Sequence, residues 1–268
     1  MPDRIRRRLW PEKAQGAVSL SYDGGDPSHL ETVAPCLEAL CLQATFYAPP
    51  TRILETPRQW TALAAAGHEI GNATLFDAAD PDGFLSDWTA EMVERDVEMG
   101  EDFYREVFGR SGDHSCACPV PRRESTAGDD RLSIRRMQQH SMLRPILRSR
   151  FQVARDSTEG YNDPASCDVL ALRCVRAADF VADEFVLLTQ QALAAKAWVI
   201  FAFDGVGVGE PAVDAVEHAK FCLWLAEHRG VAFVGTVYDV GCRVRKNAAA
   251  VAQQGEPQKL PVEARPTA

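Results

Sequence analysis

Short apolar runs of strand length alternate with longer amphipathic stretches along most of the chain. This order is typical of repeated βα units, in which each strand is followed by a helix that covers the sheet. About seven runs have the length and composition of buried strands: residues 17–22, 43–48, 68–74, 115–118, 168–172, 198–203 and 231–237. The pattern predicts an α/β fold built on a parallel barrel or a doubly wound parallel sheet.

Helices are predicted between these runs. The clearest spans residues 89–109, where apolar side chains recur at helical spacing and Gly109 suits the C-terminal cap. Another is expected to start after Ser28, although Pro35 in its interior should bend or shorten it. A third, within residues 212–230, ends in His, Arg and Gly, which is a typical C-terminal sequence.

The chain of 268 residues has the length of a single α/β barrel domain. We expect one domain over residues 1–245 and a disordered tail over residues 246–268, which are small, polar and contain proline. Segment 122–155 breaks the alternating pattern because it is rich in arginine, and a solvated surface is the usual explanation for such a segment.

The formal net charge of −9 argues against nucleic acid or anionic membrane as a partner, because both need a positive protein surface. No apolar run approaches the length of a membrane-spanning helix, and no export signal is evident, so we expect a cytoplasmic protein. The eight cysteines are then expected to be mostly buried free thiols rather than a disulfide framework. The sequence predicts no particular oligomeric state.

Polar residues follow several of the predicted strands. In parallel α/β folds the active site lies at the carboxyl ends of the strands, so these residues are the candidates for chemistry. Three of them are the aspartates Asp23, Asp77 and Asp204, which we expect to converge in one cavity. Carboxylates that converge either bind a hard cation or shift one another's pKa, so that one is protonated and another is ionised. Further substrate-binding candidates at strand ends are Asn72, Thr74, Cys118, Arg122 and Tyr238.

Four stretches carry a resemblance to a known family. They are "LSYDGG" (20–25), "AGHEIGNATLFD" (66–77), "CACPVPR" (116–122) and "VIFAFDGVG" (199–207). In this order they resemble the motifs of the polysaccharide deacetylase superfamily, the NodB-homology or family 4 carbohydrate esterases. The resemblance implies a single deformed parallel (β/α) barrel and metal-dependent hydrolysis of N-acetyl groups on sugars.

The same resemblance assigns roles to individual positions. Asp23 matches the catalytic base of the family. Gly24, Ala73 and Asp77 stand where the family has its three metal ligands. Asp204 stands where the family has a histidine, at the end of a late strand, that acts as the catalytic acid. Because Gly and Ala have no ligand atoms, two of three protein ligands are absent from this pattern.

Three functions remain open at this point. The first is a metal-free enzyme that uses Asp23, Asp77 and Asp204 for acid/base chemistry on a small metabolite or sugar-like substrate, with no cofactor. The second is a hydrolase of C–N bonds that binds a divalent ion through Asp23, Asp26, Asp77 and Asp204. The third is a non-catalytic protein that binds a ligand or a partner.

The histidines receive separate predictions. His68 is expected to fix a strand end by hydrogen bonding rather than to bind a metal. His29, His218 and His228 lie on predicted helices and are expected at the surface or at helix caps. His114 precedes a predicted strand and stays a candidate for the cavity.

Overall fold

The computed structural model describes residues 9–11, 13–75, 89–109, 113–117, 144–207 and 211–255. Its strands in that part of the chain are β1 (Gly16–Asp23), β2 (Thr45–Tyr47), β3 (Glu69–Gly71), β4 (Cys116–Ala117), β5 (Ala154–Glu159), β6 (Leu172–Arg176), β7 (Trp198–Phe203) and β8 (Ala232–Val234). Its helices include the π-helix η1 (His29–Val33) and the α-helices α2 (Ala34–Ala39), α3 (Pro50–Glu55), α4 (Pro57–Ala65), α5 (Ala90–Phe108), α7 (Ala182–Ala194), α8 (Ala215–Glu227) and α9 (Val237–Gly255).

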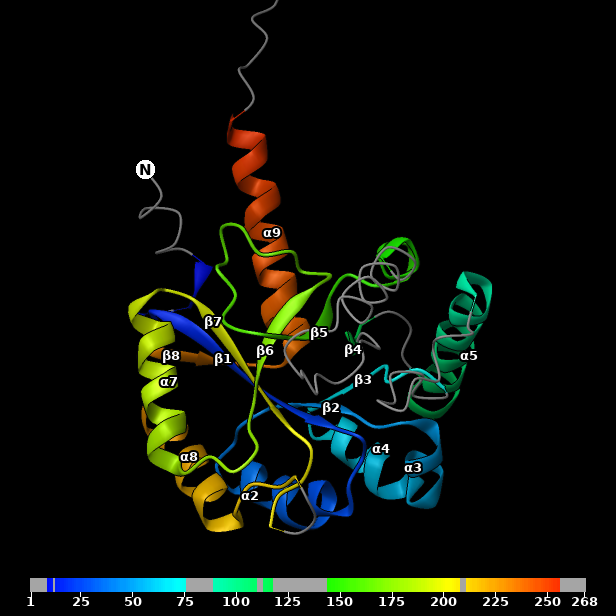
Figure 1. Cartoon of the computed structure of the whole chain (residues 1–268), viewed down its shortest axis with the longest axis horizontal. Coiled ribbons are helices and arrows are strands. Elements are labelled where there is room, and N and C mark those ends of the chain that lie inside the picture. The colour runs from blue at the N-terminus through cyan, green and yellow to red at the C-terminus, as the bar shows by residue number, and fades with distance from the viewer. Residues whose placement is uncertain are drawn as a thin grey trace, which may run out of the picture.

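The strands form a nearly closed barrel (Figure 1). Their order is β3-β2-β1-β7-β6-β5-β4, and each neighbouring pair is parallel. A parallel bridge between Asn72, just after β3, and Cys116 of β4 joins the two ends of this series. β8 lies outside the ring order and pairs with the first residues of β1. The expected α/β class and the NodB-like parallel barrel of about seven strands are confirmed.

Strand β1 is buried on both faces, because every residue from Gly16 to Tyr22 is buried. Val18, Leu20 and Tyr22 pack in the hydrophobic layer between the barrel and its helices. The alternate positions face the barrel interior, where Ala17 joins a second apolar cluster and Asp23 reaches an arginine of β5. The strand therefore separates an outer layer from an inner cavity.

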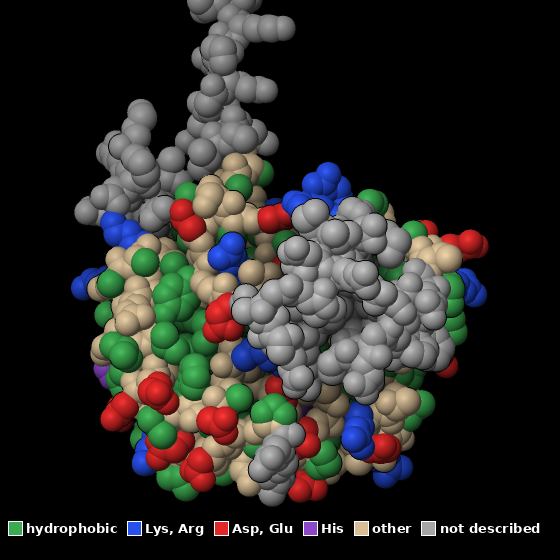
Figure 2. Space-filling model, viewed as in Figure 1, with side chains coloured by type: hydrophobic (Ala, Val, Ile, Leu, Met, Phe, Trp, Pro, Cys, Tyr) green, Lys and Arg blue, Asp and Glu red, His purple; other side chains and the backbone are tan. Residues whose placement is uncertain are grey.

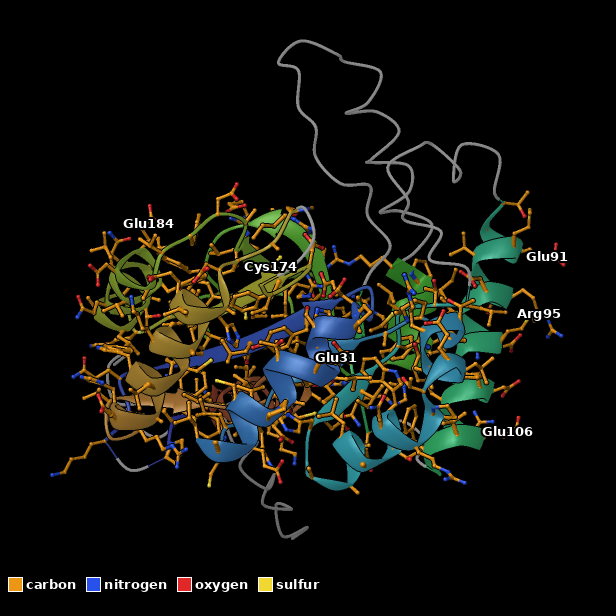
Figure 3. The ribbon with its side chains drawn as sticks, turned by 90° about the horizontal axis from the view of Figure 1, so that it is seen from below. Glu31, Glu91, Arg95, Glu106, Cys174 and Glu184 are labelled. Atoms are coloured by element: carbon orange, nitrogen blue, oxygen red, sulfur yellow. The ribbon has the colours of Figure 1, made fainter. Side chains whose placement is uncertain are left out.

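Helices cover the outside of the barrel, and many of their charged side chains point away from it. On α5, Glu91, Arg95 and Glu106 project outward, whereas Cys174 of β6 lies within the strand layer (Figure 3). On the face shown in Figure 2, basic and acidic side chains lie mixed among apolar ones. Within the described ranges, no helix combines the length and apolarity needed to cross a lipid bilayer.

Most predicted strands are found, and two regions differ. The run at 168–172 is a turn for most of its length, in which Ala171 N donates to Asp168 O at 2.9 Å, and β6 starts only at Leu172. Strand β5 was not predicted because its sequence "ARDSTE" is polar and lies in the arginine-rich segment. A strand that points an arginine into a barrel does not show the apolar run of a buried strand.

The helix predictions hold with changes at their ends. α5 has the expected C-terminal cap, with Gly109 at φ 65° and its N–H bonded to Arg105 O. After Ser28, whose side chain makes no capping bond, the chain forms η1 and then α2, so Pro35 falls in the first turn of a new helix. At the other end of the chain α9 continues to Gly255, beyond the domain boundary expected at residue 245.

Candidate active site

Two of the predicted aspartates lie side by side at the carboxyl ends of adjacent strands. β1 and β7 are paired in register as far as Tyr22 and Phe203, and Asp23 and Asp204 are the next residues of the two strands. Neighbouring strands are about 4.8 Å apart, so the two residues are direct neighbours at one mouth of the barrel. Each carboxylate is about one-sixth exposed, at 16% of its side-chain surface.

Asp23 forms an ion pair with Arg155 across the barrel. Nη2 of Arg155 lies 2.6 Å from both carboxylate oxygens, and the arginine side chain is only 4% exposed. The guanidinium also lies over the Tyr47 ring, 5.0 Å from its centre, and Nη1 contacts the Cys174 sulfur at 3.2 Å. β1 and β5 are not neighbours in the sheet, so this pair links opposite sides of the cavity.

Asp204 has a similar partner on the next strand. Nη2 of Arg176, the last residue of β6, lies 2.9 and 3.1 Å from its two carboxylate oxygens. Arg176 is more exposed than Arg155, at 29% of its side chain. Because arginine is always charged, each of the two aspartates has a cation beside it. Sequence analysis predicted carboxylates crowded together and did not predict these two arginine partners.

His29 lies directly beneath this mouth of the barrel. Its Nε2–H donates to the Asp204 carbonyl oxygen at 2.9 Å, and the side chain is fully buried. Burial lowers the pKa of His29, although the nearby charges of Asp26, Asp23 and Asp204 oppose this shift. The expectation that His29 lies at the surface is wrong, because its helix packs tightly against the end of β1.

A buried carboxylate, Glu69, supports the inner wall of the barrel. Its oxygens accept hydrogen bonds from Ser115 N at 2.6 Å, Ser115 Oγ at 2.5 Å, Thr45 Oγ1 at 2.7 Å and Tyr238 N at 2.9 Å. Ser115 Oγ also contacts the Tyr47 hydroxyl at 2.5 Å. Four donors compensate for the removal of this charge from water. This network fixes Tyr47, the ring that lies under Arg155.

Asn72 and Thr74 are buried, and the hydrogen bonds described for them join them to other residues of the protein. Asn72 Nδ2 donates to Glu101 at 2.6 Å, and Asn72 Oδ1 accepts from Thr74 N at 2.6 Å. Glu101 also contacts His114 Nε2 at 2.7 Å. Burial raises the pKa of Glu101, but the hydrogen bonds from His114 and Asn72 outweigh it, so the net shift is downward. These residues form a polar group that joins the end of β3 to α5.

The remaining predicted site residues are separate from Asp23 or lie outside the described ranges. The Tyr238 hydroxyl donates to Asp113 Oδ1 at 3.2 Å and accepts from Gln152 Nε2 at 3.3 Å, and neither partner belongs to the arginine–aspartate pairs. Asp77, Cys118 and Arg122 lie outside the residues that the structure describes. Their proposed roles stay predictions.

The described residues do not reproduce the ligand set of a family metal centre. Gly24 has no side chain, and a Cβ atom built there meets nothing within 4 Å. Ala73 offers no donor atom, and its backbone N–H is bonded to the Tyr104 hydroxyl at 3.1 Å. Asp26 Oδ1 accepts hydrogen bonds from Ser28 N and Ser28 Oγ at 2.9 and 2.6 Å. In the described part of the chain, neither Asp23 nor Asp204 belongs to a group of three His, Cys, Asp or Glu side chains whose ligand atoms are close enough together to hold one metal ion.

His68 has the structural role that was predicted for it. Its Nδ1 accepts a hydrogen bond from Ala44 N at 3.2 Å, at the level where β2 and β3 begin. Burial lowers its pKa to about 4, so the ring is neutral at physiological pH and its lone pair is available as an acceptor.

Comparison with known proteins gives a sequence match over part of the chain and a fold match over most of it. The sequence profile described as polysaccharide deacetylase matches residues 11–129. A search of curated proteins found no match. Among solved structures, a putative polysaccharide deacetylase from Mycobacterium smegmatis superposes with a TM-score of 0.62 at 13% identity, covering 97% of both chains.

Two further structures share the fold at low identity. A probable polysaccharide deacetylase from Pseudomonas aeruginosa PAO1 has a TM-score of 0.57 at 10% identity, covering 88% of this chain and 93% of that one. The catalytic domain of a peptidoglycan N-acetylglucosamine deacetylase from Eubacterium rectale has a TM-score of 0.52 at 10% identity, covering 83% and 89%. The resemblance to the polysaccharide deacetylase superfamily is thus confirmed, by sequence over residues 11–129 and by fold along nearly the whole chain.

Proposed function

We propose that this protein is a metal-independent acid/base enzyme that acts on a small metabolite or a sugar-like molecule in the cytoplasm. The reaction would be a dehydration, isomerisation, cyclisation or bond cleavage, in which Asp23 accepts a proton from the substrate. The observation that carries the proposal is the setting of Asp23, a positioned carboxylate at the carboxyl end of a barrel strand beside bare backbone.

Asp23 has the orientation that a general base requires. Arg155 holds both of its oxygens, so the carboxylate has one fixed direction, and its partial exposure leaves it accessible to a ligand. The next residue, Gly24, has φ +82° and open space where a side chain would begin. A substrate atom can therefore approach Asp23 from the side on which the family pattern has a metal ligand.

Asp204 and Arg176 would form the second half of the site. Arg176 is nearly one-third exposed, and its guanidinium has more donors than Asp204 uses, so it can bind a hydroxyl or an anionic group of the substrate. Asp204 would orient Arg176 and share proton transfer with Asp23. Asp77 is our candidate for the acid that returns a proton to the substrate.

Two findings support this assignment over the chemistry of the named relatives. Gly24 and Ala73 supply no ligand atoms at positions where the resemblance places metal ligands, and Asp23 and Asp204 are each paired with an arginine. The names of the structural relatives point to polysaccharides and peptidoglycan N-acetylglucosamine, from which we take the sugar-like character of the substrate. No step of the proposed reaction passes through a metal.

The test compares wild-type protein with Asp23→Asn in the presence of EDTA. Both are incubated with a defined mixture of amino sugars, chito-oligosaccharides and small hydroxy acids, and mass spectrometry follows losses of water, changes of isomer and cleavage products. Conversion by the wild-type protein that falls at least about 100-fold in Asp23→Asn is expected, because general-base catalysis contributes about 10² to 10⁴.

Two results would favour the other functions. Release of acetate from chito-oligosaccharides only after addition of a divalent ion would point to a metal-dependent C–N hydrolase. Ligand binding without turnover, equally strong in Asp23→Asn, would point to a non-catalytic binding protein.

A further inference from the structure

A cluster of two thiols and one imidazole lies on the opposite side of β1 from Asp23. It consists of Cys36 on α2 and His218 and Cys222 on α8, called here the thiol–imidazole cluster. His218 and Cys222 are four residues apart, so they share one face of α8. This face packs against the outer layer of the barrel, where α2 and α8 are in contact.

The ligand atoms of the cluster have the separation that a metal ion requires. One atom from each side chain can be chosen so that all lie within 4.8 Å of one another. In a tetrahedral zinc site with ordinary bond lengths, sulfur and nitrogen ligands are about 3.6 Å apart and two sulfurs about 3.8 Å apart. The Cys222 sulfur lies 3.9 Å from His218 Nδ1 and 3.7 Å from Nε2. The Cys222–His218 separation is thus within a few tenths of an ångström of the ideal value, and the separations from Cys36 to the other two ligand atoms are at most 4.8 Å.

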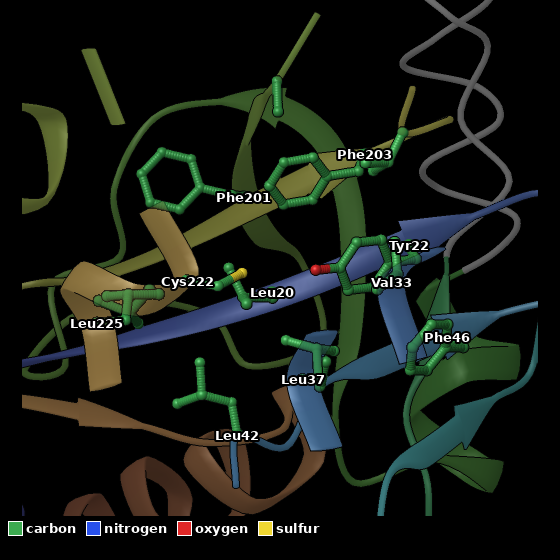
Figure 4. Close-up of a cluster of buried hydrophobic side chains, with 14 of the residues drawn as sticks. Leu20, Tyr22, Val33, Leu37, Leu42, Phe46, Phe201, Phe203, Cys222 and Leu225 are labelled. Atoms are coloured by element: carbon green, nitrogen blue, oxygen red, sulfur yellow. The ribbon is translucent and has the colours of Figure 1, made fainter. Parts of the chain in front are cut away.

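Tyr22 fixes the imidazole in the orientation that metal ligands commonly have. Its hydroxyl lies 2.8 Å from His218 Nε2, and both side chains are buried. Figure 4 shows the Tyr22 hydroxyl pointing from β1 toward the Cys222 sulfur. A histidine that binds a metal through one ring nitrogen usually donates its other N–H to a fixed acceptor. This arrangement assigns Nδ1 of His218 as the ligand atom and Nε2–H as the donor to Tyr22.

The cluster is also chemically ready to bind a soft or borderline cation. Thiolates are the form in which cysteine binds metals, and thiolate with imidazole is a ligand set that zinc prefers. Cys36 is partly exposed, which gives an ion a path from solvent to the two buried ligands.

We propose that Cys36, His218 and Cys222 bind one zinc ion through two thiolates and one imidazole nitrogen. Each thiol that is protonated before binding releases its proton to solvent. The ion would tie α2 to α8 on the outside of the barrel. It is independent of the proposed acid/base reaction, since Tyr22 and Asp23 point to opposite faces of β1.

The first measurement is the zinc content of the full-length, untagged and reduced protein after dialysis against zinc, determined by elemental mass spectrometry. One equivalent per chain is expected. With cobalt as a spectroscopic probe, thiolate-to-metal charge-transfer bands are expected in the near ultraviolet. Absence of both signals in correctly folded, reduced protein would overturn the proposal.

Variants locate the ion. Cys36→Ser should lose the stoichiometric zinc, and because Cys36 is only partly buried this variant should still fold. Cys41→Ser, which changes an exposed thiol close by in sequence, is the matched control and should keep the zinc. Tyr22→Phe should weaken zinc binding by about 10- to 100-fold through the loss of the fixed imidazole.

Asp23→Asn separates this site from any ion in the barrel interior. Zinc retained by Asp23→Asn and Cys41→Ser but lost by folded Cys36→Ser would support the proposal. Zinc retained by Cys36→Ser, or lost by Asp23→Asn, would overturn it. Neither result depends on whether a substrate for the acid/base reaction is found.

Discussion

Tyr22 and Asp23 are consecutive residues of β1, yet they face regions with opposite chemistry. Asp23 points into the barrel, where charged groups are neutralised by opposite charges, as in its pair with Arg155. Tyr22 points outward into a layer of aromatic rings, thiols and imidazoles, between Phe46 and Phe203. Because side chains alternate along a strand, the Asp23–Arg155 ion pair and the thiol–imidazole cluster lie on opposite faces of β1.

Strand β3 repeats the same division. Glu69 points inward and is satisfied by four hydrogen bonds, whereas the residue before it, His68, lies against the Phe46 ring in the outer layer. Burial lowers the pKa of both His68 and His29. The inner region therefore compensates its buried carboxylates with ion pairs or hydrogen bonds, whereas burial in the outer region favours the uncharged form of the His68 and His29 imidazoles. The predictions below test this difference.

The largest effect is expected from breaking the inner ion pair on one side only. Asp23→Ala would leave the nearly fully buried Arg155 cation without its partner, which typically costs about 3–5 kcal/mol of unfolding free energy. Urea denaturation followed by circular dichroism measures the change. Asp102→Ala on α5, whose pair with Arg105 is exposed, is the matched control and should cost less than about 1 kcal/mol.

The double variant Asp23→Ala/Arg155→Met distinguishes pairing from packing. If the charge left behind is the main cost, the double variant should be clearly more stable than Asp23→Ala alone. Equal instability of the two would show that the pair contributes through shape rather than through charge.

Sequence reasoning could predict the position of Asp23 and Asp204 but not their partners. An apolar run that ends in aspartate signals a strand end, and adjacent parallel strands bring such ends together. Arg155 lies in a polar strand without an apolar run, so nothing local indicated that it crosses the barrel.

The outer layer was harder to predict for a different reason. His218 was expected at the surface or at a helix cap, and it is buried inside α8 against Tyr22. Helix periodicity identifies a buried face only by apolar residues, and a buried histidine with a hydrogen-bond partner resembles a surface residue in that pattern. The His-x-x-x-Cys spacing in α8 is the signal that could have drawn attention to it.

The neutral state of the outer imidazoles predicts a loss of stability in mild acid. The pKa of His68 is about 4 in the folded protein and near 6.5 in the unfolded chain, so between these pH values only the unfolded chain takes up the proton. The unfolding free energy should fall as the pH drops from 6.5 toward 4, by up to about 3 kcal/mol from this group.

His68→Gln removes this titration and keeps an acceptor for Ala44 N. Its stability should depend less steeply on pH over that range than that of the wild-type protein, in urea denaturation series at fixed ionic strength. An unchanged slope in His68→Gln would show that the pKa of His68 is not lowered in the folded protein.

The smallest effect on stability is expected from placing ligand atoms in the inner site. This change bears most directly on the difference between the two faces of β1. Gly24→Asp forces a side chain onto a backbone with φ +82°, which costs about 1 kcal/mol, but open space surrounds the new Cβ atom and the protein should fold. Combined with Ala73→His, it supplies two donors where the family resemblance places metal ligands. This double variant should bind a second equivalent of zinc that persists in a Cys36→Ser background. If no second equivalent is bound, Gly24 and Ala73 do not occupy the metal positions of the family. The only remaining support for a metal-free inner site would then be the pair of Asp23 and Arg155.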